Sequence, residues 1–412
     1  MRRLVPFVLA FSLQVTCGMS ILIPMDAAQQ NHLKAYGLAY FALQKNISVD
    51  WLLNYRGGSF LMTYSTALES ECKIRGVYSE IITDRNTNQI LTQISSPAVN
   101  MNIVRMDKAP RIAVYSPKND LIMDESDAVI TVLDYAEIPY QIIYDEEILK
   151  DALLEYDWLH LHHEDFTGQV SKGMFRQQNR MEFKIQELTA TRLGYSKVSA
   201  MKYDVVKKIQ TFCASGGYLF AMCSGAETFD IALAAEGQDI EGAQYSEGVE
   251  LNFALALAFE NFELKEPGDR SFSDINVGGW GWGSESENEF FTLFDFSAKW
   301  DIVPSILTQN HEHIIREFSG LTTSFNSGLV KPDALVMAEN KFKSNVRYIY
   351  GELGKGHWTY YSGHDPESRG GGGGGRGLGR KTDLNLYPHS PGYRLILNNV
   401  LFPSASKKKR KT

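Results

Sequence analysis

The chain has 412 residues, of which 44% are hydrophobic and 22% charged, so it is long enough for two domains or one elaborated domain. Its formal net charge is −8 at pH 7 although residues 407–411 are all basic, and this acidic body argues against a general nucleic-acid-binding protein. The basic tail, 404–412, resembles a nuclear signal in composition only, and we expect it to be solvated.

The N-terminus has the pattern of a secretory signal peptide. Two arginines follow the initiator Met, an apolar run covers residues 4–13, and small residues follow around Gly18 and Ser20. The pattern predicts a signal peptide over 1–20 and an exported protein, periplasmic or extracellular, while a buried N-terminal element is the alternative. The apolar run is too short to span a bilayer, so no transmembrane span is expected.

Three cysteines would remain after cleavage: Cys72, Cys213 and Cys223. In an oxidising compartment an odd number permits one disulfide and one free thiol. A pairing of Cys72 with Cys213 would leave Cys223 reduced, but the sequence does not establish that pairing.

Residues 21–105 are predicted to form an N-terminal α/β extension. Residues 26–44 have the composition and apolar stripe of a helix, 49–55 read as a strand, and a second helix begins at 66–71. Gly57 and Gly58 are expected in a tight turn.

From about residue 106 to 403, strands and helices alternate in a second predicted domain. Two late strands, 347–352 and 357–362, are expected around the turn Gly354-Lys355-Gly356. Before them, strands expected at 111–115, 140–144, 158–162 and 218–222 alternate with helices expected at 124–137, 146–154, 180–193 and 199–214. This alternation predicts a right-handed parallel βαβ sheet with its ligand site beyond the carboxyl ends of the strands. Residues 267–289, with Trp280 and Trp282, and the glycine-rich 368–382 are expected to be loops.

The segment 216–230 has the layout of a nucleophile elbow. Its apolar run predicts a buried strand, and Cys223 falls where that strand must turn into a helix. A helix N-terminus lowers the pKa of a thiol, and Ser224 and Gly225 are small enough to let a substrate approach. The alternative is an inert buried cysteine.

A nucleophilic thiol needs a base and a group that orients the base. His364, Asp365 and Glu367 follow the strand expected at 357–362, so they could meet Cys223 at one edge of the sheet.

These features resemble the class I glutamine amidotransferase-like superfamily. The resemblance implies a three-layer α/β sandwich with a mostly parallel, flavodoxin-like sheet. It also implies that Cys223 is the nucleophile, His364 the base, and Glu367 or Asp365 the orienting acid.

Nearly the whole of residues 21–403 further resembles an exported bacterial family common in Bacteroidetes, through ILIPMDAAQ, WLLNYRGGSFL, FDFSAKWD, GHDPE and SPGYRLILNNVLFP. Its members are often labelled asparagine synthetase B. That enzyme resembles a different amidotransferase class, with a cysteine directly after the initiator Met and an SGGxDS-type loop. Here residue 2 is Arg and Ser215-Gly216-Gly217 continues into Tyr-Leu-Phe, so the residues argue against asparagine synthesis.

A histidine cluster opens a different interpretation. The strand that usually ends in a Pro-Gly-Gly oxyanion loop in the superfamily is followed here by histidines and acids. His160 and His162 share one face of the strand, with His160 expected inside the sheet, and His163, Glu164 and Asp165 follow, so a divalent metal with imidazole and carboxylate ligands is conceivable. We expect no cofactor, with a metal at His162, His163 and Glu164 as the alternative.

The sequence thus predicts an exported hydrolase that acts on an amide or related carbonyl bond of a small molecule or peptide. The alternative is a non-catalytic ligand-binding protein. It would hold its ligand with His162, His163, Glu164 and the tryptophans of 267–289, near Ser224 and Gly225. The sequence leaves the substrate and the oligomeric state open.

Overall fold

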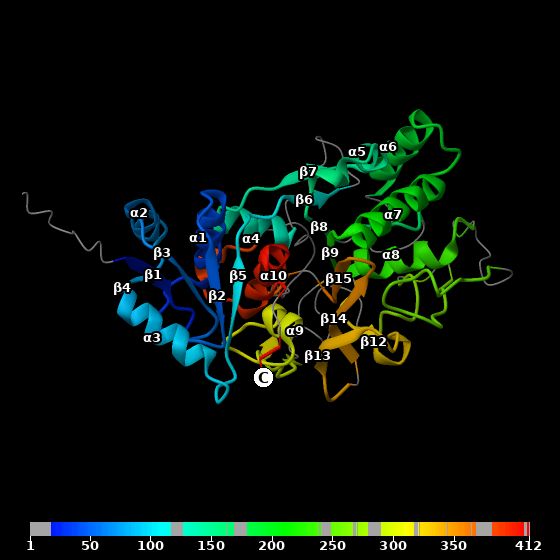
Figure 1. Ribbon diagram of the computed structural model, residues 1–412. Helices are drawn as coiled ribbons and strands as arrows, with labels where there is room; N and C mark the ends of the chain where they lie inside the picture. Colours follow the sequence, from blue (N-terminus) through cyan, green and yellow to red (C-terminus); the bar gives the residue numbers. More distant parts are fainter. Residues whose placement is uncertain are drawn as a thin grey trace, which may run out of the picture.

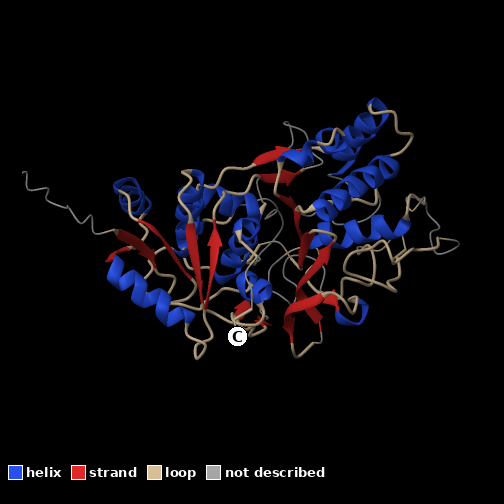
Figure 2. Cartoon of the chain, in the orientation of Figure 1, coloured by secondary structure: helices blue, strands red, loops and turns tan. Residues whose placement is uncertain are grey.

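The computed structural model describes residues 18–116, 127–162, 164–168, 179–238, 240, 249–266, 269, 271–278, 290–316, 320, 322–343, 345–363, 365–367, 381–407 and 410–411. This part of the chain forms two β-sheets, with helices between them and on their outer faces (Figures 1 and 2). The expected signal peptide and the glycine-rich loop lie almost wholly outside the described residues and stay predictions.

The first sheet is antiparallel throughout, in the order β4-β1-β3-β2-β5. Its strands are β1 (Met19–Ile23), β2 (Val49–Leu53), β3 (Ser59–Thr63), β4 (Glu80–Thr83) and β5 (Asn102–Met106). Three helices belong to the same segment: α1 (His32–Gln44), α2 (Thr66–Arg75) and α3 (Asp84–Ser95). The sequence predicts α1, β2 and α2, but α1 begins six residues later than expected, where the Asn31 side chain accepts the N–H of Lys34.

The second sheet has ten strands, nine of which follow the order β11-β10-β13-β14-β15-β9-β8-β6-β7, with β12 paired to β14. Their bounds are β6 (Ile112–Tyr115), β7 (Gln141–Ile143), β8 (Trp158–Leu161), β9 (Tyr218–Met222), β10 (Phe290–Leu293), β11 (Ile314–Arg316), β12 (Phe325–Asn326), β13 (Leu335–Asn340), β14 (Asn345–Leu353) and β15 (Gly356–Tyr361). The strands β7, β6, β8, β9 and β15 run parallel to one another, and the remaining pairs are antiparallel.

The expected three-layer sandwich with a mostly parallel, flavodoxin-like sheet is therefore wrong. The fold is mixed α+β, because one sheet is wholly antiparallel and about half of the other is antiparallel as well. The two strands expected around Gly354 are present as the antiparallel hairpin of β14 and β15.

Helices separate the two sheets and cover the far face of the second (Figure 1). The remaining helices are α4 (Ala128–Ala136), α5 (Asp145–Leu149), α6 (Asn179–Arg192), α7 (Val198–Ser215), α8 (Cys223–Ala235), α9 (Ile302–Leu307) and α10 (Pro391–Leu401), with 3₁₀ turns at Ala152–Glu155, Ser327–Leu329, Leu384–Leu386 and Phe402–Ser404. One hydrophobic core joins α1, α4 and α10 to both sheets, and a second lies between the ten-stranded sheet and α7 and α8. None of the described helices combines the length and the apolar character needed to cross a membrane.

Candidate functional site

The junction between β9 and α8 is a sharp strand-to-helix turn at Cys223. Met222 has extended backbone angles, and Cys223 adopts a φ of +54° before the helix continues. A residue with a β-carbon seldom occupies this left-handed region, and such strain is concentrated at functional sites. The elbow expected from the sequence is therefore present.

Gly225 lets this turn pack closely against the end of β8. Its N–H donates to the carbonyl oxygen of His162 at 2.9 Å. A β-carbon at residue 225 would overlap that oxygen, so only glycine fits here without a backbone shift. Ser224 is also buried, and its hydroxyl has no hydrogen-bond partner among the described residues.

The sulfur of Cys223 is fully buried and accepts a hydrogen bond from the backbone of another segment. The N–H of Thr322 lies 3.3 Å from Sγ, and the Thr322 hydroxyl donates to Glu227 at 2.5 Å. Glu227, one turn beyond Cys223 on α8, also accepts bonds from the N–H and hydroxyl of Ser273 at 3.0 and 2.7 Å. A buried carboxylate is thus tied to the segment that contacts the thiol.

The end of β15 approaches the same segment. Tyr361 is paired with Met222, and two residues further on the N–H of Gly363 donates to the Thr322 carbonyl oxygen at 2.6 Å. Gly363 and Cys223 therefore both hydrogen-bond to Thr322. His364 directly follows but lies outside the described residues.

The two candidate orienting acids are both described. Asp365 is buried and accepts bonds from the hydroxyls of Tyr393 and Thr382, at 3.1 and 2.6 Å, and from the N–H of Glu367 at 2.9 Å. These contacts anchor the segment after β15 to α10.

The other two thiols differ from Cys223 in their setting. Cys72 and Cys213 are buried free cysteines, so the disulfide considered from the sequence does not form in this structure. Burial raises the pKa of Cys72, and it raises the pKa of Cys213 to about 12.

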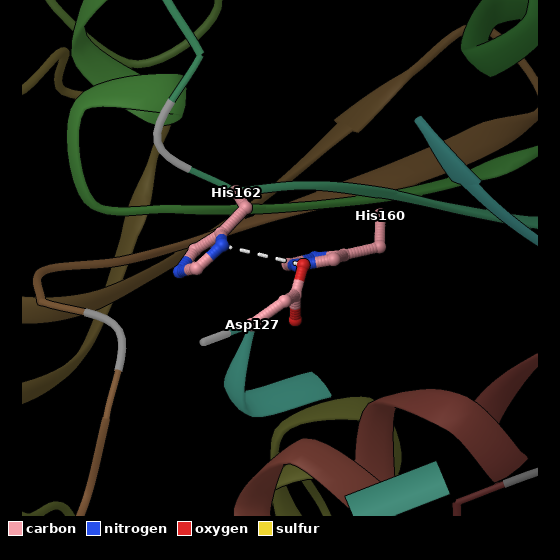
Figure 3. A group of neighbouring side chains, drawn as sticks. All are labelled: Asp127, His160 and His162. Carbon is pink, nitrogen blue, oxygen red and sulfur yellow. Dashed lines mark ion pairs between the residues drawn. The ribbon is translucent and has the colours of Figure 1, made fainter. Parts of the chain in front are cut away.

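The histidines near the end of β8 form a group with a residue that the sequence analysis did not select. His160 and His162 lie on the same face of the strand, and the Asp127 carboxylate meets both rings (Figure 3). Asp127 Oδ2 is 3.2 Å from His160 Nε2 and 3.3 Å from His162 Nδ1. This buried group could hold a metal ion.

The expected ligand set of His162, His163 and Glu164 is therefore not the set that the structure brings together. The Glu164 carboxylate accepts the backbone N–H of His162 at 3.0 Å, and His163 lies outside the described residues.

Asp127 is held in place by the start of α4. Its Oδ1 accepts the N–H groups of Val129 and Ile130 at 2.7 and 3.0 Å, so it caps the helix while Oδ2 faces the histidines. Burial raises the pKa of the Asp127 carboxyl, but its interactions with the rings of His162 and His160 lower it by more, so that the pKa of Asp127 lies well below its usual range. The sequence signal was an Asp directly before the apolar helical run AVITVL.

No family model and no curated protein matches the chain. Among solved structures, the chain is similar to two cytoplasmic proteins, STM3548 of Salmonella typhimurium and STM1381 of Salmonella typhimurium LT2. Each is 12% identical to this chain, and each comparison covers 72% of this chain and 100% of the other protein. The TM-scores are 0.38 for STM3548 and 0.36 for STM1381. The GH42 β-galactosidase Gan42B of G. stearothermophilus is 9% identical over 63% of this chain and 28% of its own, with a TM-score of 0.29.

Proposed function

We propose that the chain is an exported hydrolase that cleaves an amide or related carbonyl bond through Cys223, as its resemblance to amidotransferase-like proteins implies. The observation that carries the proposal is the φ of +54° at Cys223, at the start of α8 and at the carboxyl end of a parallel strand. Energetically unfavourable backbone at a nucleophilic residue persists only when the surrounding structure holds it in place.

The proposed reaction has two steps. The Cys223 thiolate attacks the carbonyl carbon, a sulfur–carbon bond forms, and the amine leaves with the proton that His364 took from the thiol. Water then attacks the acyl-enzyme, the sulfur–carbon bond breaks, and the acid is released. Glu367 or Asp365 orients His364 in this scheme.

Two features near Cys223 favour the negatively charged thiolate form of its side chain. Sγ lies at the N-terminus of a thirteen-residue helix, where the helix dipole favours negative charge, and it accepts the Thr322 N–H. Both features stabilise the charged form of the sulfur relative to the neutral thiol.

The first experiment is alkylation of the purified protein by iodoacetamide between pH 5 and 10, with each cysteine followed by mass spectrometry. We expect Cys223 to react with an apparent pKa below the free-thiol value of about 8.5. His364→Ala should raise that pKa. Cys213 is an internal control, because burial has raised its pKa to about 12.

His357→Ala is the matched control variant, since His357 lies near the start of β15, away from the end that pairs with Met222. The hydrolase proposal fails if Cys223 reacts no faster than Cys213. It also fails if the alkylation rate of Cys223 depends on pH in the same way in His364→Ala and in His357→Ala. If the two variants show that Cys223 and His364 interact, the next experiment is a screen of amide substrates, with Cys223→Ala as the inactive reference.

One observation favours the second candidate function, a non-catalytic ligand-binding protein. Cys223 has no exposed surface, whereas a nucleophile has to meet its substrate. Slow alkylation of Cys223 at every pH would support this alternative.

A further inference from the structure

The His160 ring has a fixed orientation with a chemical consequence. Its Nδ1 lies 3.2 Å from the carbonyl oxygen of Phe220 on the neighbouring strand β9. A carbonyl oxygen only accepts hydrogen bonds, so Nδ1 carries the hydrogen and, in a neutral ring, Nε2 presents its lone pair.

That lone pair would face a negatively charged oxygen. His160 Nε2 lies 3.2 Å from Asp127 Oδ2, is fully buried, and does not meet this oxygen in hydrogen-bonding geometry. A lone pair this close to a carboxylate oxygen is repulsive, so we expect a positive charge at or near the two atoms. Either a second proton on the ring or a bound cation can supply it.

The distances match those of a metal site. A tetrahedral ion with bonds of about 2.0–2.1 Å to nitrogen and oxygen places neighbouring ligand atoms about 3.3 Å apart. The two distances from Asp127 Oδ2, 3.2 Å to His160 Nε2 and 3.3 Å to His162 Nδ1, agree with this value, and one ligand atom from each of the three residues lies within 4.8 Å of the others.

The supporting contacts also match. In metal sites the second nitrogen of a histidine ligand usually donates to a carbonyl or carboxylate, and ligand carboxylates accept further hydrogen bonds. Here Nδ1 of His160 binds the Phe220 carbonyl, and Oδ1 of Asp127 accepts two N–H groups of α4. These contacts orient both side chains through Nδ1 and Oδ1, so Nε2 of His160 and Oδ2 of Asp127 are left to bind a metal.

We propose that Asp127, His160 and His162 bind one divalent transition-metal ion through Oδ2, Nε2 and Nδ1. Two imidazoles and one carboxylate suit zinc or iron(II), and they leave at least one coordination position for water or a ligand. Magnesium and calcium prefer oxygen ligands and are not expected to bind. The inference does not depend on the chemistry of Cys223.

The test uses the full chain after treatment with a chelator. Equilibrium dialysis against Zn²⁺, followed by elemental analysis, should find one tightly bound ion per chain, and the same experiment with Mg²⁺ or Ca²⁺ should find none. Co²⁺ in place of Zn²⁺ should give the visible absorption of a four- or five-coordinate site. A folded wild-type protein that retains no Zn²⁺ and no Co²⁺ would overturn the proposal and leave a doubly protonated His160.

The variants locate the ion. Asp127→Asn keeps the shape of the side chain and an oxygen that can cap α4, so it should fold while its Zn²⁺ affinity falls at least tenfold. His160→Asn and His162→Asn should have the same effect, whereas His357→Asn, outside the group, should bind as wild type. Circular dichroism melts establish that each variant is folded.

One further variant excludes a competing site. The rings of His32, His311 and His389 also lie close together, with centroid distances of 4.7 and 4.9 Å. Zinc that is lost in His311→Gln but retained in Asp127→Asn would place the ion there and overturn the proposal.

Discussion

Gly225 and His162 are in backbone contact: the N–H of Gly225 donates to the carbonyl oxygen of His162 at 2.9 Å, and no β-carbon fits between them. This contact holds the first turn of α8 against the end of β8. It therefore connects the Cys223 elbow with the histidine group.

Gly225→Ala should disrupt this contact. The added methyl group overlaps a carbonyl oxygen, which cannot move as a flexible side chain would, so the elbow has to shift. We expect a loss of about 1–3 kcal/mol in the free energy of unfolding and a changed alkylation profile at Cys223. Urea denaturation and alkylation measure the two effects. Gly76→Ala is the matched control for space, since nothing lies within 4 Å of a β-carbon there, although its positive φ adds a cost of its own. An unchanged Gly225→Ala protein would contradict the close packing.

Thr322 connects Cys223 to Glu227, and its hydroxyl can be removed without changing the size of the side chain. Thr322→Val leaves the buried Glu227 carboxylate one hydrogen bond short, which should cost about 1–3 kcal/mol. Because the Thr322 N–H contacts Sγ, the alkylation rate of Cys223 should change as well. Thr322→Ser restores the hydroxyl and should recover most of the stability. A Thr322→Val protein that is as stable as wild type, or less destabilised than Thr322→Ser, would contradict a stabilising bond between the Thr322 hydroxyl and Glu227.

The elbow could be predicted from the sequence because its causes are local. An apolar run followed by a cysteine predicts a strand and a turn, and both are present at Cys223, whereas the packing of Gly225 against the His162 carbonyl oxygen was not predicted. The antiparallel half of the second sheet was also accessible, since strands joined across Gly354 by so short a turn cannot be parallel. The sequence analysis placed these two strands around that turn, but it did not predict the antiparallel strands β10 to β13.

The partners of the site residues could not be predicted in the same way. Asp127 meets His160 and His162 only because β6 pairs with β8, which brings the helix after β6 to the edge where β8 ends. Thr322 reaches Cys223 from a segment 99 residues away. These contacts join residues that are far apart in the sequence, so they depend on how helices and strands pack, and no short sequence motif indicates them.

A buried ion pair between α7 and α5 offers a test of stability away from the site. Lys202 donates to both Asp145 oxygens at 2.8 and 2.9 Å and to the Tyr115 hydroxyl at 2.6 Å. Lys202→Met would leave the Asp145 charge buried without its partner and should lower the free energy of unfolding by roughly 3–5 kcal/mol. Lys202→Met combined with Asp145→Leu should be less destabilised than Lys202→Met alone. Urea denaturation of the double-mutant cycle measures the coupling, and additive losses would contradict it.

His32 should make the protein less stable in acid. Burial and the nearby Arg394 lower the pKa of His32 to about 3, and the rings of His311 and His389 act in the same direction, while its contact with the Asp26 carbonyl oxygen opposes them. Its pKa in the unfolded chain is about 6.5, so between pH 6.5 and 3 the unfolded state binds the additional proton. The free energy of unfolding therefore falls as the pH is lowered through this window. Between pH 7 and 4.5 this one residue should contribute roughly 2–3 kcal/mol of the loss.

His32→Gln isolates this contribution, because the amide nitrogen of Gln can still donate to the Asp26 carbonyl oxygen and does not titrate. Urea denaturation of both proteins at pH 7, 5.5 and 4.5 should show a shallower loss of stability in the variant. Carboxylates lose their charge in both proteins, so only the difference between them reports on His32. His313→Gln, at an exposed histidine, should follow the wild-type curve. Parallel curves for wild type and His32→Gln would mean that His32 has the same proton affinity in the folded and unfolded states, which would contradict its burial beside Arg394.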